Sequence, residues 1–344
     1  MTGFRNIFRN ISATAAGKTA IAVTGVAAVC CMTGCDVHEF PYDRATVDVV
    51  VTVHHDLPWT SIDYTYEEGR ANLSRDGSSE TGRGQLWTAR YIFRAYPRGE
   101  RGTSYREFTM SSDDLTLADF DITLPLPAGD WDICVWQDLV SDAEQPPYYN
   151  VADFAAITYN MPYRGDTDRR DAFEGTTSVS VRATYDSDAE ERARIDMERP
   201  MARYVFIATD YDLFTTGMSK GEDDSDFSIY ASYPLFMPAV YNMFTSKILD
   251  SWRGVSYRAH ITPLNEKEAV IAIDYVFMNH HESGAQVLLG LTDPRGATTA
   301  ITPTVTVPLQ RGQTTYVRGK FLTNTVGNGI DIDFSFSGDI NIEL

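Results

Sequence analysis

The sequence has few cysteines, few positive charges and no apolar run long enough to cross a membrane. Three of its four cysteines lie within the first 35 residues, and Cys134 stands alone in the rest of the chain. This excludes a disulfide framework, so the stability of the fold must come from packing. Acids outnumber bases by 48 to 29, which gives a formal net charge of −19. Such a body is repelled by phosphate and anionic headgroups, which disfavours nucleic acid and leaves protein, neutral glycan or cations as partners.

The first 34 residues have the three-part layout of a secretory signal peptide. Arg5, Arg9 and Lys18 precede an apolar run at 19–32, which is shorter than the ~20 residues that a membrane-spanning helix needs. A glycine stands directly before Cys35, and this pair resembles a bacterial lipobox. We therefore expect residues 1–34 to be removed and Cys35 to carry palmitate-type acyl chains. Secretion without a lipid is the alternative.

Two acids follow the expected lipid site closely. Asp36 and Glu39 resemble the acidic tether that marks some lipoproteins for export to the cell surface. Two or three acyl chains bind a membrane far more firmly than one, since each buried methylene contributes ~0.8 kcal/mol. The leader therefore predicts a protein anchored in the outer membrane through its amino-terminal lipid and exposed at the cell surface.

Alternation of apolar and polar residues predicts β-strands along most of the remaining chain. In residues 46–54, four valines fall on one face and polar residues on the other. The pattern returns at 87–95 and 131–135, and a segment with two prolines and a glycine joins 120–126 to 131–135, which predicts a hairpin. Cys134 lies in one of these strands, where a cysteine is more often a small core residue than a nucleophile.

The polar stretch 185–194 has almost no apolar residue to bury, so we expect it to be an exposed linker. It divides the chain into a first β-sandwich over 35–184 and a second over 195–344. Proline at the first turn and apolar residues recurring every three to four positions predict one short helix at 238–249. Further strands are expected at 154–160, 177–181, 254–261, 269–278, 286–291, 304–309, 314–322 and 330–336.

Two segments of the second half resemble the fimbrillin-type proteins of Bacteroidota. Residues 195–204 read Ile-Asp-Met-Glu-Arg-Pro-Met-Ala-Arg-Tyr, and residues 307–319 are similar to the pattern Pro-Leu-x-Arg-x-x-x-Thr-x-Val-x-Gly. The resemblance implies an all-β chain of two tandem transthyretin-like (Ig-like) sandwiches in a surface lipoprotein. Polymerising members are trimmed at an arginine after the first strand, and residues 54–66 offer no such site. The resemblance is therefore closest to the fimbrial anchor members that keep their lipid.

Four clusters of polar residues could in principle bind a metal or catalyse a reaction, but their patterns favour a structural role. Residues 54–56 (His-His-Asp) and 280–282 (His-His-Glu) lie in a row, but neighbouring strand residues point to opposite faces and neither spacing is that of a known metal site. The acidic loop 222–226 lacks the glycine and distal glutamate of an EF-hand. Asp130 and Asp132 flank a tryptophan as glycosidase carboxylates would, yet any outward strand face gives this pattern. We therefore expect no catalytic residue, metal or cofactor, and no enzymatic activity.

Aromatic residues in two loops are candidate binding residues. Trp59, Tyr64 and Tyr66 lie in one loop, and Tyr148 and Tyr149 follow two prolines in another. Aromatic side chains can stack on sugar faces or fill a protein interface, and core packing explains most of them in β-sandwiches.

Two hypotheses for the function follow. In the first, the chain is a structural or adhesion protein, a fimbrial anchor or accessory subunit that binds other fimbrial or surface-protein subunits by β-strand addition. In the second, it is a surface lipoprotein that binds glycan through its loop aromatics. An exposed aromatic row that includes Trp87 and Trp136 would favour glycan binding, and burial of these rings would favour assembly.

The carboxy-terminal residues continue the strand pattern to the end of the chain. Isoleucine and phenylalanine alternate with polar residues in 330–336, and Ile340, Ile342 and Leu344 keep the same register. We expect 330–336 to complete the second sandwich and the tail 339–344 to be a candidate for strand addition to a neighbour.

Overall fold

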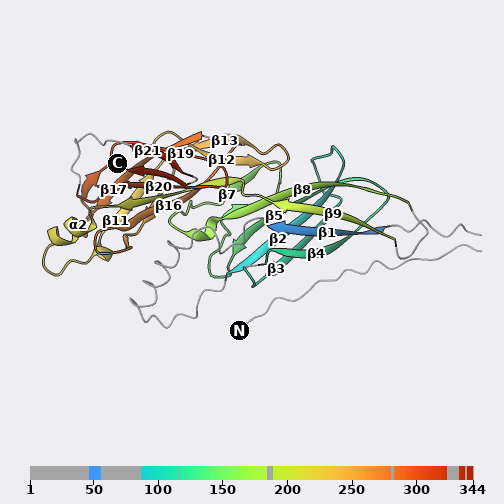
Figure 1. The fold of residues 1–344 in the computed structure, drawn as a ribbon, viewed down its shortest axis with the longest axis horizontal. Coiled ribbons are helices and arrows are strands. Elements are labelled where there is room, and N and C mark those ends of the chain that lie inside the picture. The colour runs from blue at the N-terminus through green and yellow to red at the C-terminus, as the bar shows by residue number, and fades with distance from the viewer. Residues whose placement is uncertain are drawn as a thin grey trace, which may run out of the picture. The chain divides into compact units, whose positions relative to one another are not determined.

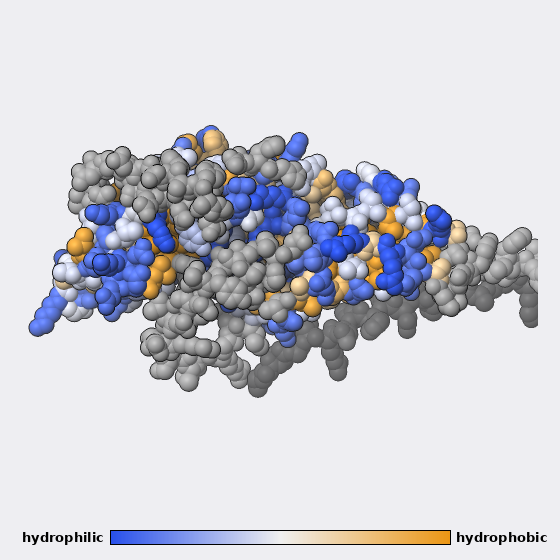
Figure 2. All heavy atoms as spheres, viewed as in Figure 1, coloured by the Kyte–Doolittle hydropathy of each residue, from blue (hydrophilic) through white to orange (hydrophobic). Residues whose placement is uncertain are grey.

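The computed structural model describes residues 46–55, 87–115, 117–183, 189–279, 283–323, 333–337 and 339–343. Nearly all regular elements in these residues are β-strands (Figure 1), so the predicted all-β fold is confirmed. No helix in this part of the chain is long and apolar enough to cross a membrane. On the face shown in Figure 2, hydrophilic residues predominate and hydrophobic ones form small separate groups.

Two facing sheets enclose a first hydrophobic cluster, which we call the valine core. In one sheet, β1 (Val47–His55) lies between the antiparallel strand β4 (Asp119–Leu126) and the parallel strand β9 (Glu190–Met197). The four alternating valines of β1 are exposed by 3% or less, as a half-buried strand requires. The facing sheet contains, in spatial order, β3 (Arg106–Ser112), β2 (Thr88–Pro97), β5 (Gly129–Val140) and β8 (Ala172–Val181).

The two central strands of the facing sheet, β2 and β5, are buried on both sides. Ile133 and Val135 of β5 belong to the valine core, whereas Cys134 and Trp136 belong to a second cluster, which we call the tyrosine core. Successive strand residues point to opposite faces, so β5 separates the two cores. This explains why β2 and β5 contain almost continuous apolar runs.

Three further sheets contribute to the tyrosine core. The first contains, in order, β15 (Thr262–Pro263), β16 (Ala269–Phe277), β10 (Met201–Ala208), β20 (Thr314–Gly319), β22 (Asp339–Glu343) and β21 (Asp333–Ser337). The second contains β14 (Ser256–Ala259), β11 (Ser228–Ser232), β17 (Ser283–Thr292) and β18 (Thr298–Ile301), with β19 (Val305–Leu309) also paired to β17. The third contains β13 (Lys247–Arg253), β12 (Phe236–Asn242), β7 (Ile157–Tyr159) and β6 (Tyr149–Asn150).

The helix predicted at 238–249 is wrong. These residues belong to β12 and β13, which form an antiparallel hairpin with Ser246 at a φ of 49° in its turn. Val240, Tyr241 and Ile248 are spaced as in a helix, but valine, tyrosine and isoleucine all prefer strands. The described residues do hold one short α-helix in the second half, at α2 (Tyr211–Gly217), together with the 3-10 turns η1 (Asp168–Arg170) and η2 (Asp224–Asp226).

Two connections also differ from the sequence prediction. The turn after β4 does not make a hairpin, because β4 pairs with β1 while β5 pairs with β2, so the chain passes from one sheet to the facing sheet. Within the predicted linker 185–194, residues 190–194 belong to β9 and pair with β1. Their side chains are half-buried or exposed, which is why the stretch is polar. The division into domains at 35–184 and 195–344 stays a prediction.

Candidate functional site

The densest group of buried charges joins residues 168–174 to the second half of the chain. We call it the charged seam, and it consists of four ion pairs: Asp168–Arg203, Arg170–Asp274, Asp171–Arg199 and Glu174–Arg311. The segment is shaped by η1, whose cap Thr167 accepts the backbone N–H of Arg169 at 3.1 Å, and by the start of β8. All four partners in the second half lie in β10, β16 or the loops beside β10 and β20.

The pair Arg170–Asp274 is the most deeply buried of the four. Its side chains are exposed by 1% and 0%, and Asp274 also accepts the hydroxyls of Tyr163 at 2.6 Å and Tyr233 at 2.7 Å. The backbone N–H of Tyr275 donates to it at 2.8 Å. Burial would lower the pKa of Arg170, but the Asp274 carboxylate raises it well above its ordinary value. The guanidinium therefore stays charged and serves as a permanent donor.

The pair Asp171–Arg199 is bidentate. Arg199 donates from Nε and Nη2 to the two carboxylate oxygens at 2.8 and 2.6 Å, and its guanidinium lies 4.4 Å from the centre of the Phe173 ring. Planar, two-point bonding of this kind is both stronger and more specific than a single contact. It fixes the loop that leads from β9 into β10 against the start of β8.

The fourth pair uses the arginine of the sequence pattern at 307–319. Arg311 donates to Glu174 at 2.6 Å and to the hydroxyl of Tyr241 at 3.0 Å, and Tyr241 donates to Glu174. Burial raises the pKa of Glu174, while Arg311 and Tyr241 lower it. The loop before β20 is thereby tied to β8 and to β12.

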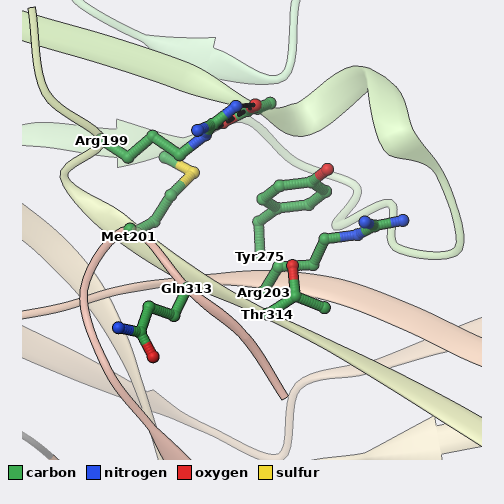
Figure 3. Close-up of a pocket in the computed structure, with 8 residues that line it drawn as sticks. Arg199, Met201, Arg203, Tyr275, Gln313 and Thr314 are labelled. Carbon is green, nitrogen blue, oxygen red and sulfur yellow. Dashed lines mark hydrogen bonds and ion pairs between the residues drawn. The ribbon is translucent and has the colours of Figure 1, made fainter. Parts of the chain in front are cut away.

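A small cavity lies beside the seam and is shown in Figure 3, where Arg199, Tyr275 and Arg203 lie close together above Gln313 and Thr314. Its volume is about 10 Å³, which has room for one water molecule. Arginine cannot act as an acid or base near neutral pH, and each carboxylate of the seam is already paired. The arrangement is suited to holding strands together rather than to converting a substrate.

A larger groove of about 450 Å³ lies between residues 161–163 and 252–256. Met161, which is 63% exposed, and Trp252 contribute its apolar surface, and Arg253 and Ser256 contribute polar groups. The Arg253 guanidinium lies 4.3 Å from the centre of the Phe236 ring. The volume falls within the range of ligand pockets.

The candidate binding aromatics that the structure describes are buried. Tyr148 and Tyr149 are exposed by 7% and 2%, so these two candidates do not form an exposed platform. Tyr149 packs against Trp136, which is fully buried. Trp87 is half-buried and stacks on Tyr148 with ring centres 6.0 Å apart. Cys35, Asp36, Glu39, Trp59, Tyr64, Tyr66, His280, His281 and Leu344 lie outside the described residues.

The candidate strand-addition tail pairs within its own sheet. Ile340 and Ile342 lie in β22, which pairs in parallel with β20 and antiparallel with β21. Donation of this strand to a neighbour would require it to leave both partners. Its role in strand addition stays a prediction.

The remaining polar clusters have structural partners. His54 contacts Asp119, and burial lowers the pKa of His55. Asp132 accepts hydrogen bonds from Ser178 at 2.6 Å and Arg101 at 2.7 Å. In the described part of the chain, no group of three or more His, Cys, Asp or Glu side chains could hold a metal ion.

Cys134 is exposed by 1%, and burial raises the pKa of its thiol to about 12. It is therefore a core residue, as its place in a strand predicts. Two acids of the loop 222–226 stabilise the loop itself, since Asp223 caps η2 in a capping box with Asp226.

Sequence reasoning missed the seam, although one signal was available. Asp274 is the single charged residue in the strand β16, whose nine residues are all buried. An acid in the middle of such a run requires a buried cation or several donors, because an isolated carboxylate is too costly to desolvate. The position of the partner, about a hundred residues earlier, could not be read from the sequence.

Comparison with known proteins gives a family and several distant structural likenesses. The model of a family described as a family of unknown function (DUF6562) matches residues 44–344. No curated protein matches the chain. The fimbrial anchor protein Mfa2 from Porphyromonas gingivalis is 13% identical with a TM-score of 0.39, over 74% of this chain and 82% of that one.

Two other solved structures are similar at the same level. A fimbrial assembly protein from Parabacteroides distasonis ATCC 8503 is 12% identical with a TM-score of 0.37, over 79% of this chain and 90% of that one. A DUF1812 protein from Bacteroides thetaiotaomicron VPI-5482, proposed to bind polysaccharide, is 12% identical with a TM-score of 0.42, over 74% and 79%. At these values the likeness carries no conclusion about function.

Proposed function

This chain belongs to the DUF6562 family, and we propose that it is a lipid-anchored structural or adhesion protein of the cell surface. In this role it is an anchor or accessory subunit that binds other fimbrial or surface-protein subunits by β-strand addition. It is not an enzyme, and its residues serve packing and assembly rather than chemistry.

The observation that carries this proposal is where the two fimbrillin-like segments lie. Residues 195–204 and 307–319 are more than a hundred positions apart, yet β10 and β20 pair in parallel from Arg203↔Thr314 to Ala208↔Gly319. The loop before β20 also meets the first residue of β10, because the N–H of Gly312 donates to the carbonyl of Met201 at 2.8 Å. The two segments therefore form one structural unit.

Four of the six fixed positions of the pattern at 307–319 have a packing or bonding role for their side chains. Leu309 and Val317 are buried, and the hydroxyl of Thr315 donates to the carbonyl of Pro308 at 2.6 Å. Arg311 belongs to the charged seam. A pattern whose residues lie in the core or join β20 to β19 and its preceding loop to β8 supports a structural role.

The leader supports the proposed location. A signal peptide over 1–34 that ends at Cys35 supplies a lipid anchor, and Asp36 and Glu39 supply the signal for the outer face. Burial of Tyr148, Tyr149 and Trp136 supports assembly rather than glycan stacking by these rings.

The test is fractionation of cells that express the parent chain or Cys35→Ala. The parent should sediment with the outer membrane, and added protease should digest it on intact cells. Cys35→Ala should appear in a soluble fraction, because the acyl chains are its only anchor. The matched control is Cys134→Ala, which removes a different cysteine and should stay in the membrane. A Cys35→Ala protein that sediments with the membrane would contradict the lipid anchor, and full protection of the parent from protease would contradict surface exposure.

A further inference from the structure

The two sheets around the valine core are unequal in size. The sheet of β4, β1 and β9 has three strands, while the facing sheet of β3, β2, β5 and β8 has four. On one side of the sandwich, β4 and β3 are both edge strands, and no strand of the described residues pairs with the outer edge of either. One contact joins them, a hydrogen bond of 3.3 Å from Nη2 of Arg106 to the carbonyl of Pro125.

The hydrogen-bond phase of β4 shows which backbone groups face this open edge. The N–H of His55 donates to the carbonyl of Ala118 at 2.9 Å, which makes His55 and Ala118 a hydrogen-bonded pair. Such pairs alternate with non-bonded pairs in an antiparallel ladder. The backbone groups of Asp121 and Thr123 therefore point away from β1, and no described residue bonds to them. Position 125 also points away from β1, and proline is tolerated there because its missing N–H removes no bond to β1.

The side chains beside this edge form an apolar strip. Phe108 in β3 is 41% exposed and packs on the buried Phe93, with ring centres 6.0 Å apart. Tyr105 is 52% exposed and lies 4.8 Å from the ring of Trp131. Among the described residues before β6, these are the large hydrophobic side chains that are exposed. These two rings are thus exposed at the place where, among the described residues, the smaller sheet has no strand opposite β3.

The outer face of β4 is acidic. Asp119 and Asp121 are exposed there, on the side of the strand opposite Phe120 and Ile122. A strand that pairs with β4 would place alternate side chains next to these acids and the others next to the apolar strip. Asp119 contacts His54 and Asp121 accepts the hydroxyl of Thr52 at 2.6 Å, but both acids stay exposed. Basic side chains on a neighbouring strand therefore suit this face, and apolar side chains suit the strip.

We propose that the outer edge of β4 receives an extended segment of a partner protein in which apolar residues alternate with lysine or arginine. The inference rests on the proposed function and names the edge and the chemistry of the partner segment. Backbone bonds to Asp121 and Thr123 supply affinity, and the apolar side chains cover Phe108 and complete a sandwich of four strands on four. A second copy of this chain is a poor donor, because its net charge is −19 and its carboxy-terminal strand is already paired.

The test is photocrosslinking on intact cells from the full-length lipidated chain. Phe108 is replaced by p-benzoylphenylalanine, and the crosslinked peptide of the partner is sequenced by mass spectrometry. Tyr230 in β11 carries the same probe as a control, since its exposure of 45% is close to that of Phe108. The variant Thr123→Pro removes one outward N–H without touching the bonds to β1, and Thr123→Ser keeps that N–H.

The expected result is an adduct at Phe108 with a segment that alternates apolar and basic residues. Thr123→Pro should reduce this adduct about tenfold or more, because the outward hydrogen bonds supply the affinity, and Thr123→Ser should preserve it. An adduct that Thr123→Pro leaves unchanged, a saccharide in place of a peptide, or an acidic segment would overturn the proposal.

Absence of an adduct at Phe108 would also overturn the proposal for the β4 edge. The control at Tyr230 then shows whether the proposed function fails with it. If Tyr230 gives adducts with surface proteins, the proposed function stands and only the edge is wrong. If neither position gives an adduct and the native protein resists protease on whole cells, the proposed function fails as well.

Discussion

The two cores of this chain are built from different side chains. The valine core contains one buried tyrosine, Tyr91, among residues that are mostly aliphatic, whereas the tyrosine core contains ten buried tyrosines. A valine has no polar atom to satisfy, but a buried tyrosine hydroxyl needs a hydrogen-bond partner. The difference therefore predicts a buried hydroxyl network with its ion pair in the tyrosine core, whereas the buried polar groups beside the valine core are isolated ones such as Gln137, which is 1% exposed.

The tyrosine core meets this need by a chain of hydroxyls that ends at one carboxylate. The Tyr204 hydroxyl lies 2.9 Å from that of Tyr233 and 3.1 Å from that of Tyr257, and Tyr233 donates to Asp274 at 2.7 Å. Asp274 can accept several hydrogen bonds, and Arg170 neutralises its charge. The comparison teaches that the buried ion pair is a consequence of building a core from tyrosine.

The largest effect is expected in the valine core. Val51→Asp places a carboxylate at a position with 0% exposure and no cation, which should cost about 5 kcal/mol or more. This is comparable to the whole stability of a domain, so the strands around β1 should not form. Val50→Asp is the matched control, because Val50 is half-buried on the other face, opposite Arg192. Circular dichroism and limited proteolysis measure both, and equal melting temperatures would contradict the assignment of this core.

A smaller effect is expected from breaking the ion pair in the tyrosine core. Asp274→Ala leaves Arg170 buried without a counter-charge and removes the acceptor of two tyrosines, which should destabilise the fold by about 3 to 5 kcal/mol. The double variant Arg170→Met with Asp274→Leu should recover much of this loss, because neither charge then remains. Chemical denaturation compares the three proteins. If the double variant were less stable than Asp274→Ala, the unpaired charge of Arg170 would not be the cause of the loss, and this prediction would be wrong.

The smallest effect is expected where β5 separates the cores. Burial raises the pKa of Cys134 from its ordinary value of 9.0 to about 12, so the folded thiol should resist iodoacetamide at pH 9 and react after denaturation. Because the folded pKa is the higher one, this contribution to stability is present below pH 9 and is lost as the pH rises toward 12. Cys134→Ala should lack this part of the pH dependence and lose about 1 kcal/mol or less in packing. The reaction is measured by mass spectrometry with Cys30, Cys31 and Cys35 replaced by serine, and rapid labelling of the folded chain would contradict burial.

Sequence reasoning worked best where a strand is buried on one face. The alternation in 46–54, 120–126 and 304–309 corresponds to β1, β4 and β19, because such strands show their two faces as two residue classes. It failed for β3 and for residues 190–194, where exposed edge strands lack a buried face to mark them. The segment 238–249 predicts a helix because valine, tyrosine and isoleucine recur there at helical spacing, but it lies in the β12–β13 hairpin.

The sequence by itself determined the all-β class of the fold, the exclusion of a disulfide framework and the aliphatic character of the valine core. These follow from composition and alternation, which are local properties. Only the tertiary structure decided that Tyr148 and Tyr149 are buried, that Asp274 pairs with Arg170, and that β4 pairs with β1 rather than β5. Each of these depends on which distant segment lies alongside, and strand pairing across a hundred residues leaves no periodic trace in either partner. The edge position of β4 belongs to the same class, since among the described strands it depends on which ones lie beside it.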